Sequence, residues 1–162
     1  MELQGITDKA LSVITECGYG KEHLFITDEF MSEPFAFYEE EGYRVDNSLR
    51  EIITDFYMIN VGKRGVLSDG VFTPTKNAFL ENTFTVCPEN IYDAYPLFEK
   101  LGNAVEDKIV PLGLINDDYI AYGESGRVYI IGDNVFVGGE TWVDFLNNFA
   151  ENNVYSPEKI LN

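Results

Sequence analysis

The chain has 162 residues, of which 45% are hydrophobic and 24% charged, a composition that fits a globular domain with its own core and excludes a disordered acidic tail. It carries 28 acidic side chains against 11 basic ones, which gives a formal net charge of −17 at pH 7. Because such a surface repels phosphates and attracts basic groups, we expect no direct binding to nucleic acid or to membranes.

The first part of the chain predicts three helices, over residues 7–18, 32–43 and 46–59. Thr7 is the candidate N-cap of the first helix, and Gly18 follows its end as a stop. Ser32 is the candidate cap of the second helix, with Pro34 in its first turn and Gly42 at its end.

Strand patterns follow the third helix. Short β-branched and aromatic runs, separated by glycine, aspartate and asparagine, predict strands over residues 57–61, 70–75 and 82–86. Residues 88–102 have a helical pattern that contains Pro96. Since proline removes a backbone hydrogen bond inside a helix, we expect two short turns or a broken helix there.

The strongest β pattern lies in the C-terminal half. Four short runs predict a meander of antiparallel strands over residues 108–115, 119–123, 127–132 and 134–138. Thr141 and Asp144 then have the spacing of a capping box that opens a last helix over residues 142–152.

This order of elements predicts an α+β fold. We expect a single domain over residues 1–162, with a core of about residues 8–151 and a loose tail over residues 152–162. A mostly antiparallel mixed sheet is expected to pack against the N-terminal and C-terminal helices. No linker rich in glycine or serine divides the chain.

The thiols and the N-terminus predict a cytoplasmic protein. Cys17 and Cys87 have neither zinc spacing nor a CxxC motif, so free thiols in a reducing cytosol are expected. The N-terminus lacks the basic region and apolar stretch of a signal peptide, and no run of about 18 apolar residues occurs.

Gly123-Glu124-Ser125-Gly126 has the outline of a serine-nucleophile motif. A nucleophile elbow needs G-x-S-x-G between a strand and a helix. Here the second glycine follows the serine directly, and a strand pattern comes next. We therefore interpret Ser125 as the tip of a turn in which Gly126 can adopt a positive φ.

His23 is the single histidine, so a hydrolase with Ser125 or Cys17 as nucleophile would have to use it. The carboxylate runs at residues 39–41 and 117–118 are the candidates for an oxygen-only metal site. Because consecutive glutamates on a helix point about 100° apart, residues 39–41 cannot converge on one ion. We expect no metal, no cofactor and no catalytic residue.

Several short motifs follow one another in the C-terminal half: Leu101-Gly102, Pro111-Leu112-Gly113, Gly126-Arg127-Val128-Tyr129, Val137-Gly138 and a helix over residues 142–149. Their order and spacing resemble the third subgroup of the SUKH superfamily of bacterial immunity proteins. The resemblance covers about residues 8–151. Near the first helix, Gly18-Tyr19 stands where the family tends to have Gly-Trp. After the third helix, residues 56–58 lack the glycine of the family's Phe-Gly pair.

The resemblance implies an α+β fold that binds and blocks the toxic domain of a polymorphic toxin. Such toxins are often nucleases or deaminases, which hold nucleic acid and tend to be basic. The expected partner is therefore a basic cognate toxin domain of the nuclease or deaminase class. A charge of −17 fits such a partner, since opposite charge speeds encounter.

The resemblance also implies structural roles for the residues of its motifs, which are Gly18, Tyr19, Pro111, Gly113, Gly126, Arg127, Tyr129 and Gly138. Pro111 is expected at a strand start or edge, since it cannot donate to a ladder. Gly113 and Gly126 would permit a bend or a close approach. Tyr129 is expected either in the core or on a binding face.

Exposed acidic and aromatic side chains are the candidate partner contacts, because aromatic anchors carry binding energy and charges set encounter rates. They are Asp117, Asp118 and Tyr119 on one turn, Asp133 on another, and Glu39, Glu40 and Glu41 at the end of the second helix. We expect a monomer, or a weak homodimer paired through an exposed strand edge.

Three other functions stay open. The first is a general protein-interaction or regulatory domain of the same fold with no toxin partner. The second is the hydrolase that would use His23, and the third is an acidic inhibitor that mimics DNA. A toxin gene beside the gene for this chain would distinguish an immunity protein from the first of these.

Overall fold

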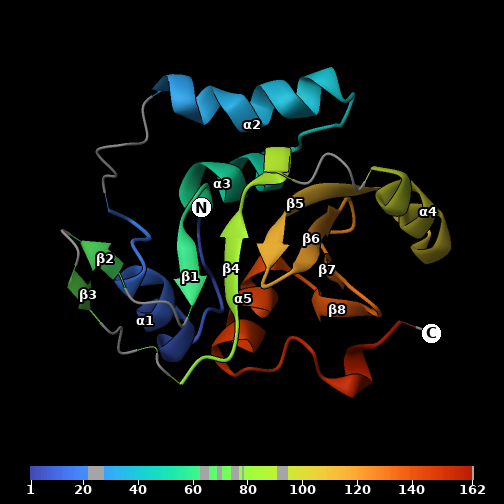
Figure 1. The fold of residues 1–162 in the computed structure, drawn as a ribbon. Helices are drawn as coiled ribbons and strands as arrows, with labels where there is room; N and C mark the ends of the chain where they lie inside the picture. The colour runs from blue at the N-terminus through green and yellow to red at the C-terminus, as the bar shows by residue number, and fades with distance from the viewer. Residues whose placement is uncertain are drawn as a thin grey trace.

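The computed structural model describes residues 1–21, 28–62, 66–68, 71–73, 77, 79–90 and 95–161. In chain order these form α1 (Asp8–Glu16), α2 (Asp28–Glu40), α3 (Asn47–Phe56), β1 (Asn60–Gly62), β2 (Val66–Ser68), β3 (Val71–Thr73), β4 (Thr83–Val86), α4 (Tyr95–Val105), β5 (Ile109–Ile115), β6 (Asp118–Gly123), β7 (Val128–Ile131), β8 (Val135–Gly139), α5 (Trp142–Ala150) and the 3₁₀ turn η2 (Pro157–Lys159) (Figure 1). The predicted α+β fold is confirmed.

Six strands form one antiparallel sheet in the order β1-β4-β5-β6-β7-β8, and β2 pairs with β3 in a separate hairpin. Strands β5 to β8 are neighbours in sequence as well as in space, so the predicted meander is confirmed.

The main core lies on the face of the sheet that α1 and α5 cover, which is the far face in Figure 1. In β4 the buried residues alternate with half-buried ones, as a strand with one core face requires. The Phe84 ring meets those of Trp142, Phe145 and Phe149 at centroid distances of 5.8, 5.2 and 4.8 Å, all near edge-on. This aromatic cluster fixes α5 against the centre of the sheet.

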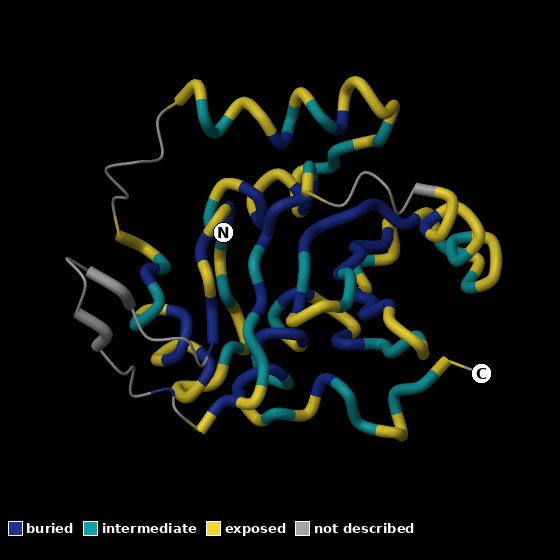
Figure 2. Tube along the Cα trace, viewed as in Figure 1, coloured by how far each residue is buried: buried dark blue, intermediate teal, exposed yellow. Residues whose placement is uncertain are grey.

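The opposite face, called here the outer face, carries a smaller core under α4. Phe98 of this helix packs against Tyr129, Ile131 and other apolar residues of β5 to β7. Figure 2 shows the buried segments of these strands in dark blue beside the helix. The cover given by α4 is limited to this part of the outer face, because its strand contacts centre on β5.

Helix α2 lies across one end of the sheet, above α3 in Figure 1. The fully buried Tyr38 hydroxyl donates a hydrogen bond to the carbonyl oxygen of Pro111 in β5. Near the other end of the helix, the rings of Phe30 and Tyr57 lie 5.4 Å apart. These contacts hold α2 against the sheet.

Local capping follows the sequence closely. The side chain of Thr7 accepts a hydrogen bond from the backbone of Ala10, and that of Thr141 accepts one from Asp144. Gly18 follows α1 with a φ of +114°, and Gly42 follows α2 with a φ of +74°, values that glycine adopts without strain.

The predicted start of the second helix is wrong, because α2 begins at Asp28 rather than after Ser32. Ser32 lies inside the helix and donates its hydroxyl proton to the carbonyl oxygen of Glu29. Asp28 and Glu29 occupy the first turn, where the helix dipole favours acidic side chains. Pro34 therefore lies in the helix interior.

The expectation of a divided helix over residues 88–102 is confirmed in part, because residues 88–90 form a 3₁₀ turn and α4 begins only at Tyr95. The break does not lie at Pro96, however. Pro96 is the second residue of α4, where the missing N–H would have no intrahelical partner in any case. The helix continues unbroken through Gly102 to Val105.

Pro111 lies neither at the start of its strand nor on an edge strand, since β5 is an interior strand. The pairing of β4 with β5 begins only at Gly113, and the register with β6 shifts between Pro111 and Gly113. This bulge, beyond the end of the β4 ladder, is where a strand tolerates proline.

The segment after Asn152 is packed rather than loose. Val154 is completely buried, and the Tyr155 ring meets that of Phe136 in β8 at 5.3 Å. Leu161 donates its N–H to the carbonyl oxygen of Val135, which extends the edge of β8. Among the described residues, the fold thus reaches to residue 161.

Candidate functional site

The turns between β5 and β6 and between β7 and β8 lie at the same end of the meander. They carry the candidate residues Asp117 and Asp133, and Asp118 is the first residue of β6. A Cβ atom on Gly132 would lie 2.2 Å from the Asp118 carboxylate, so the two turns are in close contact. The structure therefore brings these three acidic candidates together.

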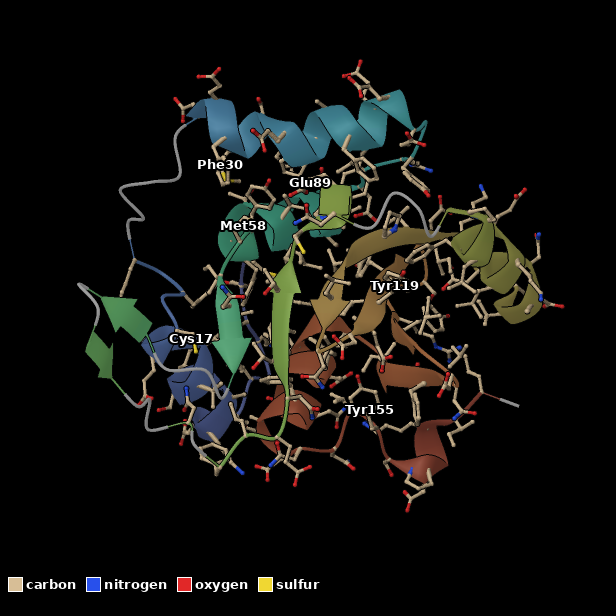
Figure 3. All side chains as sticks on the ribbon, in the orientation of Figure 1. Cys17, Phe30, Met58, Glu89, Tyr119 and Tyr155 are labelled. Atoms are coloured by element: carbon tan, nitrogen blue, oxygen red, sulfur yellow. The ribbon has the colours of Figure 1, made fainter. Side chains whose placement is uncertain are left out.

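Asp118 and Tyr119 lie in β6 and not on the predicted turn, and both serve the fold. The Asp118 carboxylate accepts a hydrogen bond of 2.8 Å from the Tyr155 hydroxyl, and burial together with this carboxylate raises the pKa of Tyr155. Tyr119 is half-buried against the α4 helix, as Figure 3 shows. Asp117 and Asp133 are exposed and remain candidate contacts.

Helix α2 presents an acidic surface. It contains no Lys or Arg, and all of its acidic residues are exposed. They are Asp28, Glu29, Glu33, Glu39 and Glu40. Glu41 follows directly and is exposed too. The carboxylates at the C-terminal end oppose the helix dipole, which favours cations there. Local helix stability therefore does not explain their position.

The acidic end of α2 lies far from the turns that carry Asp117. Just after it, Arg44 and Asp46 share a hollow with Glu124 of the turn between β6 and β7. That turn is at the other end of β6 from the turn at residues 116–117. The structure thus separates residues 39–41 from the other acidic candidates.

Ser125 lies on the predicted turn, where Gly126 has a φ of +92°. The Ser125 and Tyr129 hydroxyls both donate to the Asp107 carboxylate, the latter over 2.9 Å, and the Ser125 N–H donates to it over 3.3 Å. Asp107 also borders a hollow of about 400 Å³ beside α4. Through these hydrogen bonds Asp107 connects the turn at Ser125 to the loop before β5. Its role, and that of Ser125, is therefore structural.

The thiols have the properties of buried side chains. Burial raises the pKa of Cys17, and it raises that of Cys87 to about 11, which lowers the thiolate fraction that a nucleophile needs. The Cys17 sulfur accepts a hydrogen bond from the Asn77 amide at 3.7 Å. His23, the base of the hydrolase hypothesis, lies outside the described residues.

The motif glycines allow close approach of backbones. A Cβ atom on Gly113 would lie 2.0 Å from the carbonyl oxygen of Thr85 in β4, and one on Gly138 would lie 3.1 Å from the Phe145 ring of α5. Neither position leaves room for a larger residue without movement of its neighbours.

The remaining motif residues also support the fold. Tyr129 is 1% exposed and belongs to the smaller core, not to a binding face. Arg127 is exposed and pairs with Glu140 at 2.7 Å. The Tyr19 ring stacks on that of Phe56 at 5.0 Å, which packs the first turn after α1 against α3.

Glu89 forms a partly buried polar cluster beneath α2. Its Oε1 accepts a hydrogen bond of 2.9 Å from the Tyr57 hydroxyl, and its Oε2 is buried with no partner among the described residues. Burial raises the pKa of Glu89, and the nearby Glu33 of α2 raises it further. Sequence patterns gave no sign of this cluster, because it needs α2 to lie over the 3₁₀ turn at residues 88–90.

A groove of about 370 Å³ runs over the outer face of β1, β4 and the end of β5. Its lining includes Met58, Asn60, Thr83, Thr85 and, at one end, the candidate residue Asp117. The polar–apolar alternation of residues 83–86 predicts that Thr83 and Thr85 share one face. The groove itself depends on β1 pairing with β4, which the sequence does not show.

Neither a metal cluster nor a membrane span is found in the part of the chain that the structure describes. No three His, Cys, Asp or Glu side chains there are grouped to hold an ion. No helix there is both long and apolar enough to cross a bilayer.

The site therefore consists of exposed carboxylates on α2 and on the turns at residues 117 and 133, with a groove between β1 and β5. The chain matches no known family model, no curated protein and no solved structure. The likeness to the SUKH superfamily stays a resemblance carried by its short motifs.

Proposed function

We propose that the protein is a bacterial immunity protein, which neutralises a cognate toxin domain by stoichiometric binding and not by catalysis. The partner is a basic domain of the nuclease or deaminase class. The complex forms in the cytoplasm, where such a toxin meets its nucleic-acid substrate.

The observation that carries this proposal is the surface of α2. Its acidic side chains are exposed along the whole helix, and those of Glu39 and Glu40 lie where the helix dipole disfavours them. A position that local helix stability does not explain is typical of residues placed for binding. Together with a net charge of −17, it favours a cationic partner.

The roles of the motif residues support binding over catalysis. Ser125 is held by the Asp107 carboxylate, and both thiols have raised pKa values. The motif glycines and Tyr129 serve packing. These residues build a rigid scaffold that can present a surface to another protein.

The test is co-expression in bacteria with the toxin domain encoded beside the gene for this chain. We expect growth to be rescued and the two proteins to purify together. An unrelated protein of similar size and charge is the control for non-specific neutralisation of a basic domain. A chain that neither rescues growth nor purifies with the toxin domain contradicts the proposal.

A further inference from the structure

The outer face of the sheet is covered unequally. α4 packs over β5 to β7, while no described helix lies over the outer face of β1 and β4 (Figure 1). The uncovered part forms the groove of about 370 Å³. It lies on the outer face of the sheet, between β1 and the end of β5.

The lining of this groove is polar but almost without charge. Asn60 accepts a hydrogen bond from the Thr85 hydroxyl, and the Asn116 side chain accepts one of 3.0 Å from the Thr83 N–H. Among the described residues of the lining, Asp117 alone is charged. In a chain with 24% charged residues, such depletion is the signature of the centre of a protein interface.

Met58 adds an apolar anchor at the α2 end of the groove. Its side chain is 40% exposed, and its backbone has a φ of +59°, which is unfavourable for a residue with a long side chain. The ring of Phe30 in α2 packs on that of Tyr57, the residue before Met58. A strained backbone that exposes methionine is typical of a contact site.

Acidic side chains lie at one end of the groove and beyond the other. Asp117 lines the groove itself. Beyond the Met58 end, Figure 3 shows the first half of α2, whose first turn carries Asp28 and Glu29. An uncharged lining with acidic surroundings is complementary to a partner with a neutral centre and a basic rim.

We infer that the toxin domain docks on this groove, with Met58 as apolar anchor and with a Lys or Arg of the toxin paired with Asp117. This inference rests on the proposed function and adds the location of the interface. It places the close contact on the sheet face and leaves to the acidic side chains of α2 the long-range attraction of the basic partner.

The experiment introduces a positive charge in the lining of the groove. Thr83→Arg and Asn60→Arg are each compared with Ser12→Arg, which makes the same charge change on an exposed position of α1. Each variant is co-expressed with the toxin domain of the neighbouring gene, and urea unfolding of the purified variants confirms that they fold. We expect both groove variants to lose rescue and to bind at least about tenfold more weakly, while Ser12→Arg rescues like the wild type.

The experiment distinguishes a wrong interface from a wrong function. If the wild-type chain does not rescue growth, the proposed function fails and the inference fails with it. If all folded variants rescue like the wild type, or if Ser12→Arg loses rescue equally, the function stands and the groove is not the interface.

Discussion

The Asp107 carboxylate joins parts of the chain that lie 18 and 22 residues away, at Ser125 and Tyr129. Tyr129 is almost fully buried, and its hydroxyl donates to this carboxylate over 2.9 Å. Removing the carboxylate takes one acceptor away from both Tyr129 and Ser125, and the lost hydrogen bonds lower the stability of the fold. The family-like Gly-Arg-Val-Tyr motif is therefore tied to a residue outside the motif.

We expect Asp107→Ala to lower the free energy of unfolding by about 1–3 kcal/mol, measured by urea denaturation. Glu99→Ala, at an exposed position of α4, is the control and should change it little. Tyr129→Phe should cost less in the Asp107→Ala background than in the wild type, because the hydrogen bond between Tyr129 and Asp107 is already lost there. Equal stability of Asp107→Ala and the wild type would show that the carboxylate has no structural role.

Glu89 makes the stability depend on pH. Burial raises the pKa of Glu89 in the folded chain above its value in the unfolded chain, so the ionised carboxylate destabilises the fold. This loss of stability is complete at pH values well above the pKa of the folded chain. It disappears at pH values below the pKa of the unfolded chain. We expect Glu89→Gln to need more urea to unfold than the wild type near about pH 7. The difference should shrink as the pH falls toward about 4.

Glu40→Gln is the control for Glu89→Gln, since it removes one charge from an exposed position on α2. In Glu89→Gln the new amide oxygen can still accept the hydrogen bond from the Tyr57 hydroxyl, so packing is retained. A stability difference between Glu89→Gln and the wild type that stays constant, or grows, on acidification contradicts a buried ionised carboxylate.

At the scale of elements, the chain end is part of the fold. Val154 is fully buried in the main core, and Tyr155 packs on Phe136 while it bonds to Asp118. The end of the chain therefore fastens the turn between β5 and β6, which carries Asp117. A substitution in this segment should therefore change both the stability of the fold and the position of Asp117 in the groove.

We expect Val154→Ala to cost about 2 kcal/mol, because it removes buried methyl groups and leaves a cavity. Urea unfolding measures the loss, and Glu158→Ala on the exposed face of η2 serves as the matched control. A Val154→Ala chain as stable as the control would mean that the end of the chain contributes no core.

Elements whose signals are local could be predicted, and those that depend on tertiary contacts could not. The caps at Thr7 and Thr141 and the turn at Gly126 need only nearby residues. Pro111 could not be placed, because its tolerance depends on where β4 stops pairing with β5. The same holds for Val154, whose burial depends on the sheet that it meets.

The candidate site shows the same division. The sequence indicates acidic residues in turns and at a helix end, and Asp117, Asp133 and Glu39 to Glu41 are indeed exposed. Asp118 and Tyr119 were predicted as contacts, but they have partners that come from the C-terminal segment and from α4. The groove joins residues of β1, β4 and β5, so it appears only once the strand order is known.

At the scale of the whole molecule, a rigid sheet carries an acidic helix across its end, in a chain with a net charge of −17. Long-range attraction from such a charge speeds encounter with a basic domain and weakens with salt, while the groove supplies the contact that holds it. The net charge thus contributes to the association rate, and the groove contributes to the lifetime of the complex.

Calorimetric titration of the purified toxin domain of the neighbouring gene with this chain tests the central claim most directly. We expect saturation at one chain per toxin domain, with an affinity that falls as the salt concentration rises. A titration without saturable heat at low salt, with both proteins folded, would contradict it.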